Sequence, residues 1–398
     1  MIDKLDLKQL VQPLQNWFAD NARILPWREN PIAYYVWISE IMLQQTRVEA
    51  VKPYFDRFIR ELPDVKALAE CPEDKLLKLW EGLGYYNRVR NLKIAANQIL
   101  EEYDGVIPSE YEELIKLKGI GSYTAGAIAS IAYGKPVPAV DGNVLRVISR
   151  VTADDSDIMK QSVRKAMEQK LLELMRQDVL AGQEECSKQM EEMPTVIPSI
   201  FNQALMELGA TVCLPNGAPR CEVCPWNDLC EARIHDRISE IPVKKKAKAR
   251  RIEEKTVFII KDGDQLALHK RANKGLLAGL YELPNVDGHL DDREVIMHIM
   301  EKGYLPIRIE RVCDAKHIFS HVEWHMKGYV VFLEAREFVD KAYKNESQNK
   351  IAEGNTSDWF FVDVEETKNN YAIPSAFVKY TEYLNMTIGK EALDKKEK

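Results

Sequence analysis

Two glycines separated by one residue, Gly119 and Gly121, constrain the fold of this chain more than any other feature. Glycine adopts backbone conformations that other residues avoid, so this pair lets the chain turn tightly between two helices. In such a turn the main-chain amides and the N-terminus of the second helix can face one phosphate without a basic side chain. Small residues at 125–127 allow close packing of that helix, and Asp141 follows further along. The sequence predicts a phosphate-binding turn beside an acid, with a plain interhelical turn as the alternative.

The length of 398 residues exceeds that of one average domain and predicts two domains, each able to bury a sizeable core. With 45% hydrophobic and 29% charged residues the composition is that of a soluble protein, and no apolar run reaches the ~18 residues of a membrane span. The start, Met1 to Asp6, lacks the basic and apolar regions of a signal peptide. We therefore expect a cytoplasmic protein with no membrane partner.

Apolar residues recur at helical spacing from residue 7 to about residue 233, as in the segment 76–83, so this part is expected to be mostly helical. The basic run 243–251 has no apolar periodicity and is placed in a linker, either as a solvated connector or as an additional electrostatic contact with a polyanion. The expected divisions are a helical domain at 1–235, a linker at 236–254, a second domain at 255–385 and a polar tail at 386–398.

Strand patterns follow the linker. Residues 256–260 and 265–269 flank an Asp-Gly-Asp turn and predict a β-hairpin. Residues 329–333 and 359–362 fit two further strands, and residues 293–301 fit a helix. The second domain is therefore expected to be a small α+β domain.

Four of the seven cysteines fall close together, at Cys213, Cys221, Cys224 and Cys230. An odd number of cysteines without a secretion signal argues against a disulfide framework, and such density in a reducing compartment indicates a metal site. Structural zinc sites often pair two Cys-x2-Cys motifs, whereas this loop has one, which favours an iron–sulfur cluster held by four thiolates over zinc. We expect ordinary packed or surface residues at the isolated Cys71, Cys186 and Cys313.

Residues 38–47 predict a helix that brings Trp37, Leu43 and Gln44 onto the same face as Glu40. By composition alone, Glu40 fits either a solvated helix residue or a buried acid. Apolar neighbours would raise the pKa of a buried Glu40 by desolvation, which a general acid needs near neutral pH.

Together these motifs resemble the helix-hairpin-helix DNA glycosylases. The resemblance is carried by the segment 117–127 with its two glycines and by Asp141, which taken alone fits a helix N-cap equally well. Bifunctional members of the endonuclease III type carry a nucleophilic lysine where this chain has Tyr123, whereas the adenine-removing MutY branch carries tyrosine or serine there. The chain resembles the MutY branch.

The resemblance implies hydrolysis of the N-glycosidic bond of adenine. As in glycoside hydrolysis, the leaving base must be protonated, and the sugar develops oxocarbenium character that an anion can stabilise. By resemblance, Glu40 protonates adenine N7 and helps to manage water, while ionised Asp141 stabilises or transiently captures the anomeric carbon. Tyr123 and Asn143 would position these two acids.

Contacts with DNA are implied in the same way. A base stacked in the duplex cannot reach catalytic groups, so the target nucleotide must be flipped out. By resemblance, Gln45 and Tyr85 would fill or pry open the stack, and the Gly119–Gly121 turn would hold a phosphate. The extruded adenine would be contacted by Arg23, Leu25, Trp27, Arg28 and Gln203. From the residues alone, Leu25 and Trp27 fit a core equally well, and Tyr85 fits a surface aromatic.

The glycosylase relatives carry a 4Fe-4S cluster after the helical domain, usually with gaps of six, two and five residues between the cysteines. In this chain the gaps are seven, two and five. The extra residue lies in the loop 214–220, whose turn-forming residues can absorb it. The stretch 177–200 is also longer than the family leads us to expect, and we have no physical account of it.

Residues 275–284 resemble the approach to a Nudix box, which holds catalytic metal through glutamates. Asn285 stands where the first glutamate belongs, and Met297 and His298 replace the metal-binding pair. Neither is a hard oxygen ligand for magnesium. We expect a Nudix-like fold that serves recognition without pyrophosphatase activity.

In MutY proteins this domain reads 8-oxoguanine, and the matching residues here are Phe319, Ser320 and His321. A hydroxyl and an imidazole can form hydrogen bonds with a purine edge while Phe319 anchors the loop. Taken in isolation, the same residues fit an ordinary strand or turn.

The expected protein is therefore multidomain, with an all-α helix-hairpin-helix domain that carries an iron–sulfur loop and an α+β Nudix-like domain. We expect a monomeric, nucleoid-associated, monofunctional adenine DNA glycosylase acting on double-stranded DNA with adenine opposite 8-oxoguanine or guanine. The net charge of −7 argues against DNA binding, but Arg47, Arg88, Arg90 and Lys118 lie near the expected contacts. One alternative is a glycosylase of the same fold for thymine opposite guanine, although such relatives generally lack the Nudix-like domain. The other is a lesion-binding scaffold without chemistry, which the two acids disfavour.

Overall fold

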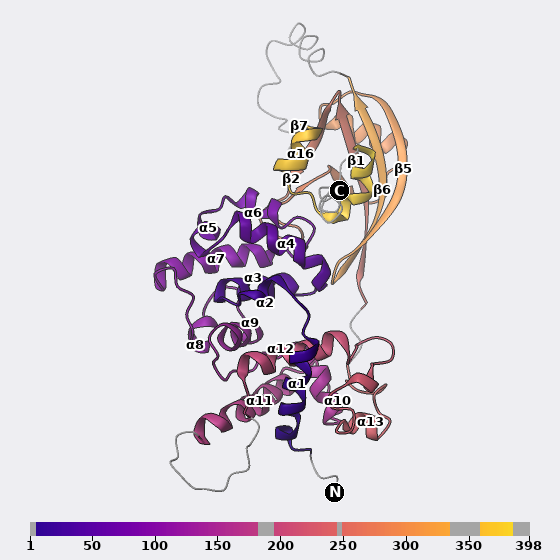
Figure 1. The fold of residues 1–398 in the computed structure, drawn as a ribbon. Coiled ribbons are helices and arrows are strands. Elements are labelled where there is room, and N and C mark those ends of the chain that lie inside the picture. The colour runs from indigo at the N-terminus through magenta and orange to yellow at the C-terminus, as the bar shows by residue number, and fades with distance from the viewer. Residues whose placement is uncertain (1–4, 182–194, 245–248, 335–358, 385–398) are drawn as a thin grey trace. The chain divides into compact units, whose positions relative to one another are not determined.

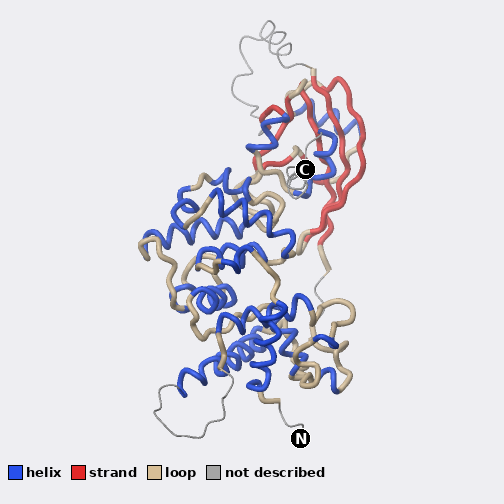
Figure 2. The backbone as a smooth tube through the Cα atoms, viewed as in Figure 1, coloured by secondary structure: helices blue, strands red, loops and turns tan. Residues whose placement is uncertain are grey.

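The computed structural model describes residues 5–181, 195–244, 249–334 and 359–384. The chain divides into two compact units, one formed by residues 1–70 and 90–247 and the other by residues 71–89 and 248–398. Helices build the first unit, and strands dominate the second (Figure 1, Figure 2). Residues 71–89, which the sequence placed in the helical domain, thus belong to the same compact unit as the C-terminal part of the chain.

The first unit is helical, as the apolar spacing predicted. Its longer helices are α1 (Val11–Asn21), α3 (Ala33–Leu43), α4 (Val48–Glu61), α7 (Asn87–Glu102, of which residues 90–102 belong to this unit), α10 (Gly142–Val151), α11 (Gln161–Ala181) and α12 (Pro198–Thr211). The shorter ones are α2 (Pro26–Glu29), α5 (Val65–Glu70), α8 (Tyr111–Leu114), α9 (Ser122–Ala127) and α13 (Glu231–Ile234). A π-helical turn, η2 (Ile128–Ala132), continues α9.

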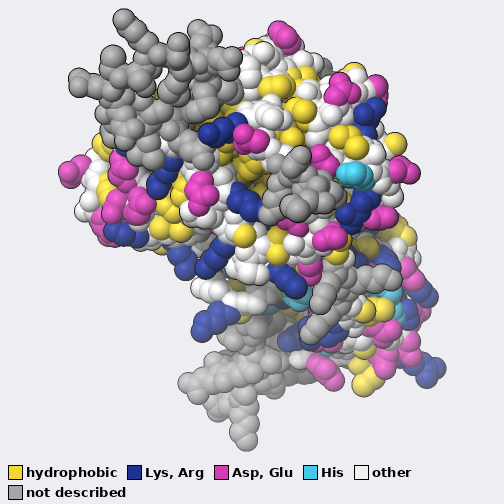
Figure 3. All heavy atoms as spheres, turned by 90° about the horizontal axis from the view of Figure 1, so that it is seen from below, with side chains coloured by type: hydrophobic (Ala, Val, Ile, Leu, Met, Phe, Trp, Pro, Cys, Tyr) yellow, Lys and Arg dark blue, Asp and Glu magenta, His cyan; other side chains and the backbone are white. Residues whose placement is uncertain are grey.

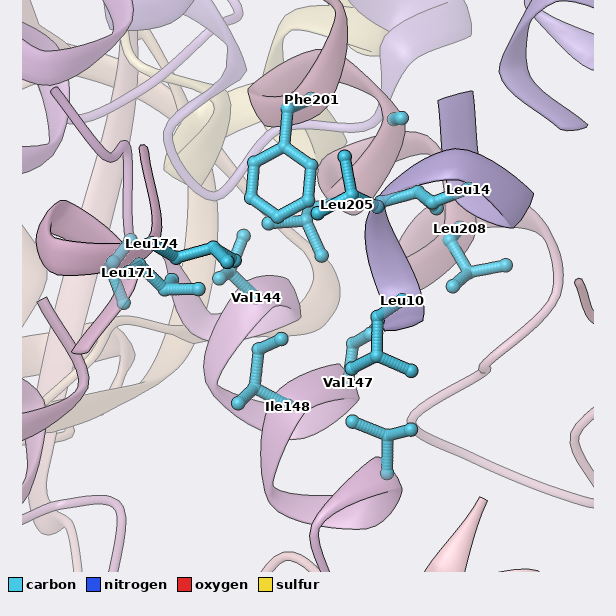
Figure 4. Close-up of a cluster of buried hydrophobic side chains, with 14 of the residues drawn as sticks. Leu10, Leu14, Val144, Val147, Ile148, Leu171, Leu174, Phe201, Leu205 and Leu208 are labelled. Atoms are coloured by element: carbon cyan, nitrogen blue, oxygen red, sulfur yellow. The ribbon is translucent and has the colours of Figure 1, made fainter. Parts of the chain in front are cut away.

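One apolar cluster packs α10 against α1, α11 and α12 (Figure 4). Its members include Leu14 of α1, Val144 and Ile148 of α10, and Leu205 of α12, all of them buried. A fully buried aliphatic side chain contributes about 2 kcal/mol relative to an exposed one. The cluster therefore fixes α10, and with it the residue that precedes its first turn, Asp141.

The second unit contains a seven-stranded mixed sheet of order β3-β2-β1-β6-β5, with β4 paired to β1 and β7 paired to β2. Strand β1 runs parallel to β6, and the other pairs are antiparallel. The strands are β1 (Arg251–Asp262), β2 (Gln265–Lys270), β3 (Tyr281–Glu282), β4 (Asn285–Asp287), β5 (Pro306–Ile318), β6 (Val322–Leu333) and β7 (Trp359–Asp363). Its α-helices within the described residues are α6 (Glu73–Leu79), α14 (Asp292–Glu301), α16 (Val364–Asn370) and α17 (Val378–Thr381).

Strand β1 is central and is buried on both faces. Val257 and Ile259 belong to one apolar cluster, whereas Phe258 and Ile260 belong to another. Successive residues of a strand point to opposite faces of the sheet, so a continuous apolar run is typical of a strand covered on both sides. The sheet therefore separates two cores.

The predicted hairpin is confirmed, because β1 and β2 pair through Asp262 and Gln265. Strands β6 and β7 and helix α14 contain the segments predicted as strands and helix. Strand β5 was not predicted, because this edge strand exposes most of its side chains and lacks apolar alternation. Strand β1 begins at Arg251, within the segment expected to be the linker. Parts of three expected features lie outside the described residues: 245–248 of the basic run, 182–194 of the long stretch and the tail 386–398.

None of the helices in the described ranges is long and apolar enough to cross a membrane. On the face that Figure 3 shows, Lys and Arg side chains are interspersed with Asp, Glu and apolar ones. The negative net charge is thus not gathered into one acidic area on that face.

Candidate active site

Glu40 lies on α3 and is buried, with 6% of its surface exposed. Trp37, one turn earlier, is buried as well. The prediction that the helix runs to Arg47 is wrong, because α3 ends at Leu43. Gln45 has a φ of 60°, a left-handed conformation that an α-helix cannot contain. Gln45 and the residue before it therefore lie beyond the helical face that carries Glu40.

Tyr123 connects Glu40 to a second helix. It stands in the first turn of α9, directly after the glycine turn, and its phenol donates a hydrogen bond to Glu40 Oε2. The phenol oxygen also lies 3.5 Å from Met206 Sδ on α12. Burial raises the pKa of Tyr123 well above its usual range, so the phenol stays protonated and can donate.

Burial raises the pKa of Glu40 from 4.5 to about 7, because the carboxylate loses its hydration. The hydrogen bond from Tyr123 favours the charged form and limits this rise, the negative charge of Asp141 adds to it, and the positive charge of Arg28 opposes it. These four groups are thus close enough to act on one another electrostatically. A carboxyl group with a pKa near 7 carries a proton for part of the time at neutral pH, as a general acid must.

Asp141 begins α10 as its N-cap. One carboxylate oxygen accepts a hydrogen bond from Val144 N at 2.7 Å, and the other accepts one from Asn143 Nδ2 at 2.7 Å. Arg146 Nη2 in turn donates to Asn143 Oδ1 at 3.0 Å and to Gly209 O at 2.8 Å. Burial raises the pKa of Asp141, while its hydrogen bonds favour the charged form. The N-cap interpretation is confirmed, and it places this carboxylate at the positive end of a helix dipole.

Glu207 on α12 is a buried acid that was not among the site residues predicted from the sequence. Its side chain is 1% exposed, and Oε2 accepts hydrogen bonds from Arg23 Nη2 at 3.0 Å and from Arg28 Nη2 at 2.8 Å. Both arginines predicted to contact the base are thus held by one acid, whose removal would leave two cations uncompensated. Glu207 stands among the apolar residues of the segment 204–208, and this is the feature that could have indicated a buried charge.

The other residues predicted to contact the base or the stack differ in how deeply they are buried. Leu25 and Trp27 are buried, and the Trp27 ring packs edge-on against a phenylalanine of α4 with centroids 5.3 Å apart. Gln203 is half-buried, and its amide donates to a backbone oxygen one turn earlier at 3.1 Å. Gln45 is exposed, and Tyr85, in the other unit, is 49% exposed. Their roles in binding stay predictions.

The glycine turn is confirmed as a tight connection. Gly119 has a φ of 79°, and a Cβ at this position would lie 2.6 Å from Asn91 Cβ, so both backbone and packing require glycine. Gly121 is the N-cap of α9, and Gly126 packs so closely that a Cβ would lie 2.2 Å from Pro138 O. Gly119 and Gly121 are both exposed, as residues that bind a phosphate must be.

The four clustered cysteines line one cavity together with residues of α10 and α13. Their thiols are free, and Arg150 Nη1 donates to Cys213 Sγ at 3.3 Å. Among the described residues, no group of three or more His, Cys, Asp or Glu side chains is placed to hold a single metal ion. Of the isolated cysteines, Cys71 is buried, Cys313 is exposed and Cys186 lies outside the described residues.

Phe319, Ser320 and His321 form the turn between β5 and β6. Phe319 N donates to Val322 O at 2.8 Å, and its ring packs edge-on against Trp324 with centroids 4.9 Å apart. Ser320 and His321 are exposed, with Ser320 Oγ 3.2 Å from His321 Nδ1. An anchored aromatic thus supports two exposed side chains that can form hydrogen bonds, as the sequence led us to expect.

The positions that depart from the Nudix box serve other purposes in the fold. Asn285 begins β4, and Met297 is exposed on α14. His298 stacks on Phe258 with ring centroids 5.4 Å apart, and burial lowers the pKa of this imidazole. A neutral, stacked imidazole contributes to packing beside the sheet.

Comparisons with known proteins agree with this architecture. A family model described as HhH-GPD superfamily base excision DNA repair protein matches residues 38–174, and a NUDIX domain model matches residues 256–383. The adenine DNA glycosylase of Buchnera aphidicola from Acyrthosiphon pisum is 32% identical over 341 residues, which cover 85% of this chain and 90% of that protein. The human adenine DNA glycosylase is 32% identical over 383 residues, covering 81% of this chain and 67% of its own length.

Among solved structures, a thermostable thymine-DNA glycosylase is similar with a TM-score of 0.47 and 26% identity, covering 57% of this chain and 96% of its own. An endonuclease III–DNA complex is similar with a TM-score of 0.46 and 24% identity, covering 60% of this chain and 100% of its own.

Proposed function

The chain belongs to the adenine DNA glycosylase family, and we propose that the adenine it removes faces 8-oxoguanine or guanine in double-stranded DNA. It is an enzyme of base excision repair that acts on the N-glycosyl bond of adenine.

The observation that carries the mechanism is the Glu40–Tyr123 hydrogen bond, formed close to Asp141. Loss of the base needs a proton on adenine and negative charge near the sugar. Glu40, with a pKa of about 7, holds such a proton near neutral pH. Burial raises the pKa of Asp141, and the hydrogen bonds from Val144 and Asn143 oppose this rise by favouring the charged form. Glu40 therefore suits protonation of adenine N7, and Asp141 suits stabilisation or transient capture of the anomeric carbon.

Tyr123 supports hydrolysis without strand cleavage. Strand cleavage through a Schiff base needs an amine nucleophile, whereas this position carries a phenol that burial keeps protonated. Tyr123 is better suited to orient the Glu40 carboxyl, as Asn143 orients the Asp141 carboxylate.

We assign a 4Fe-4S cluster to Cys213, Cys221, Cys224 and Cys230. A shared cavity lined by four free thiols fits a group larger than one ion, and Arg150 can balance thiolate charge. Such a cluster, when bound, supplies a covalent cross-link between the segments that carry its ligands. Arg150 lies on α10, so the cysteine loop is tied to the helix that begins beside Asp141.

The turn at residues 319–321 is the element we assign to reading the opposing base. A Ser320 hydroxyl can donate and accept, and a His321 imidazole offers one or two donors, so together they can match the edge of an oxidised purine. The packing of Phe319 on Trp324 supports this role, because it holds the exposed pair on a rigid base.

Release of the base is the direct test of this proposal. The protein is incubated with duplexes that carry adenine opposite 8-oxoguanine, adenine opposite guanine, thymine opposite guanine, or uracil, and alkali then cleaves each abasic site. We expect release of adenine from the first two duplexes. Release of thymine instead would favour the alternative of the same fold, and an intact strand in all four would favour a lesion-binding scaffold.

Two further measurements test the roles of individual residues. Asp141→Asn should abolish adenine release while DNA binding persists, and retained turnover would remove Asp141 from the mechanism. Abundant borohydride-trapped adducts with DNA would contradict the role given to Tyr123. For the cofactor, a brown preparation with thiolate-to-iron absorption is expected, and a colourless, zinc-loaded protein would refute the assignment.

A further inference from the structure

Residues 71–89 fall inside the match to the glycosylase family model, yet they belong to the compact unit of the C-terminal sheet. They comprise α6 and the loop that carries Tyr85. Tyr85, one of the two residues expected to enter the DNA stack, is therefore part of the same unit as the turn 319–321.

Lys78 and Glu81 attach this segment to the chain after α16. The two side chains pair at 2.8 Å, from Lys78 Nζ to Glu81 Oε2, and are only 17% and 8% exposed. Lys78 Nζ also donates to Tyr371 O at 3.0 Å, and Glu81 Oε1 accepts from Ile373 N at 2.8 Å. Loss of one member of such a buried pair leaves the other uncompensated. The pair thus fixes α6 to residues 371–373.

Hydrogen bonds and cation–π contacts of Trp80, the neighbour of Glu81, and of Arg88 hold the Tyr85 loop in place. Trp80, the neighbour of Glu81, donates from Nε1 to Gly84 O at 3.1 Å. Arg88 Nη2 donates to the same oxygen at 3.0 Å, and its guanidinium lies over the rings of Trp80 and Tyr85, 5.3 and 5.7 Å from their centroids. Tyr85 itself has a φ of 49°, a conformation that persists only where its surroundings enforce it. The exposed ring is therefore presented by a fixed loop.

The aromatic core of the same unit connects Ile373 with the turn 319–321. Ile373, Phe377 and Trp324 belong to one buried cluster, and the rings of Phe377 and Trp324 have centroids 6.1 Å apart. Trp324 in turn packs against Phe319. A continuous series of packed and hydrogen-bonded groups thus runs from the turn to Tyr85, and the Lys78–Glu81 pair is the link at its middle.

We propose that Lys78 and Glu81 are positioning residues that make the Tyr85 loop and the turn 319–321 act as one body. Recognition of the opposing base by the turn then helps to set Tyr85 in the DNA stack, and part of the preference for 8-oxoguanine over guanine arises in this way. This inference rests on the proposed function, in which the C-terminal unit reads the opposing base.

The test is the ratio of single-turnover rates of adenine release opposite 8-oxoguanine and opposite guanine. Glu81→Ala removes both the partner of Lys78 and the acceptor for Ile373 N, and we expect this ratio to fall about tenfold. Glu81→Gln keeps an oxygen that can accept from Ile373 N and should restore part of the ratio. The matched control is Glu365→Ala, which breaks an exposed pair of the same spacing with Lys368 and should leave the ratio unchanged.

A merely structural role would lower both rates together or lower the melting temperature without changing the ratio, and either result would overturn the inference. In the coupled case the effect of Ser320→Ala on the ratio should be smaller in the Glu81→Ala background than in the wild type. Equal effects in both backgrounds would also overturn it. Where Glu81→Ala does not fold, Lys78→Met keeps most of the aliphatic stem and gives the same ratio test.

The outcome separates this inference from the function on which it rests. A wild-type protein that prefers 8-oxoguanine, with an unchanged ratio in Glu81→Ala, refutes the link and leaves the proposed function intact. A wild-type protein that releases adenine equally well opposite both bases also refutes the link alone, because the proposed function includes both opposing bases. A wild-type protein that releases no adenine refutes the proposed function and the link with it.

Discussion

Replacement of Glu40 by glutamine should make the stability of the first unit less sensitive to pH. The carboxyl has a pKa of about 7 in the fold and a usual value of 4.5. Below the usual value it is protonated in both the folded and the unfolded chain and has no effect. Between the two values only the unfolded chain ionises. Each rise of one pH unit in this range therefore lowers the free energy of unfolding by about 1.4 kcal/mol. Above about pH 7 the total decrease in the free energy of unfolding amounts to about 3 kcal/mol.

Glutamine resembles the protonated acid at every pH. The free energy of unfolding of Glu40→Gln minus that of the wild type should therefore rise by about 2 kcal/mol between about pH 5.5 and about pH 8. Pulsed hydrogen–deuterium exchange of α3 peptides along a urea series measures this quantity for the first unit alone. Glu101→Gln removes an exposed carboxyl on α7 and should give a flat difference. A flat difference for Glu40→Gln as well would mean that the buried group is already ionised, which would refute its role as the proton donor to adenine.

Three more outcomes follow from the site and its packing. Single-turnover release of adenine should fall about tenfold per pH unit above about pH 7, as Glu40 loses its proton, and a rate that stays level would contradict general-acid catalysis by this group. Gly126→Ala should destabilise the protein by about 1–3 kcal/mol in thermal unfolding, because the added carbon would lie 2.2 Å from Pro138 O. Gly142→Ala meets no atom within 4 Å and should leave the melting temperature nearly unchanged, so equal effects of the two changes would disprove the packing argument. Cys224→Ser should lower the iron content and visible absorption of the purified protein, and full iron content would remove this residue from the ligand set.

Local patterns were enough to predict the helical part of the chain and the β1–β2 hairpin. Apolar spacing reports which face of a helix is buried, but it left Glu40 open between a solvated residue and a buried acid. The resemblance to the MutY branch favoured the buried acid, and Glu40 is buried in the structure. The tight glycine turn followed from Gly119, because few other residues tolerate its backbone conformation. In each of these cases the deciding interaction lies within a few residues along the sequence.

Features that depend on distant partners could not be predicted in this way. The partners of Glu207 are two arginines about 180 residues earlier in the chain, and no residue next to Glu207 indicates these ion pairs. Strand β5 is formed by pairing with β6, although its own side chains are mostly exposed. The end of α3 at Leu43 follows from the non-helical ψ of 110° at Gln44 and the left-handed conformation of Gln45, which neither amino-acid type alone demands.

The membership of residues 71–89 in the C-terminal unit means that neither unit is one uninterrupted stretch of chain. A gene fragment that starts at the basic run would encode the sheet without α6, and would expose to water the backbone amide of Ile373 that Glu81 covers. Removal of the second half would conversely strip Lys78, on the buried side of α6, of its two carbonyl partners. Dissection of this enzyme by truncation is therefore expected to yield two damaged pieces, because each half carries in its own sequence a part that the other needs.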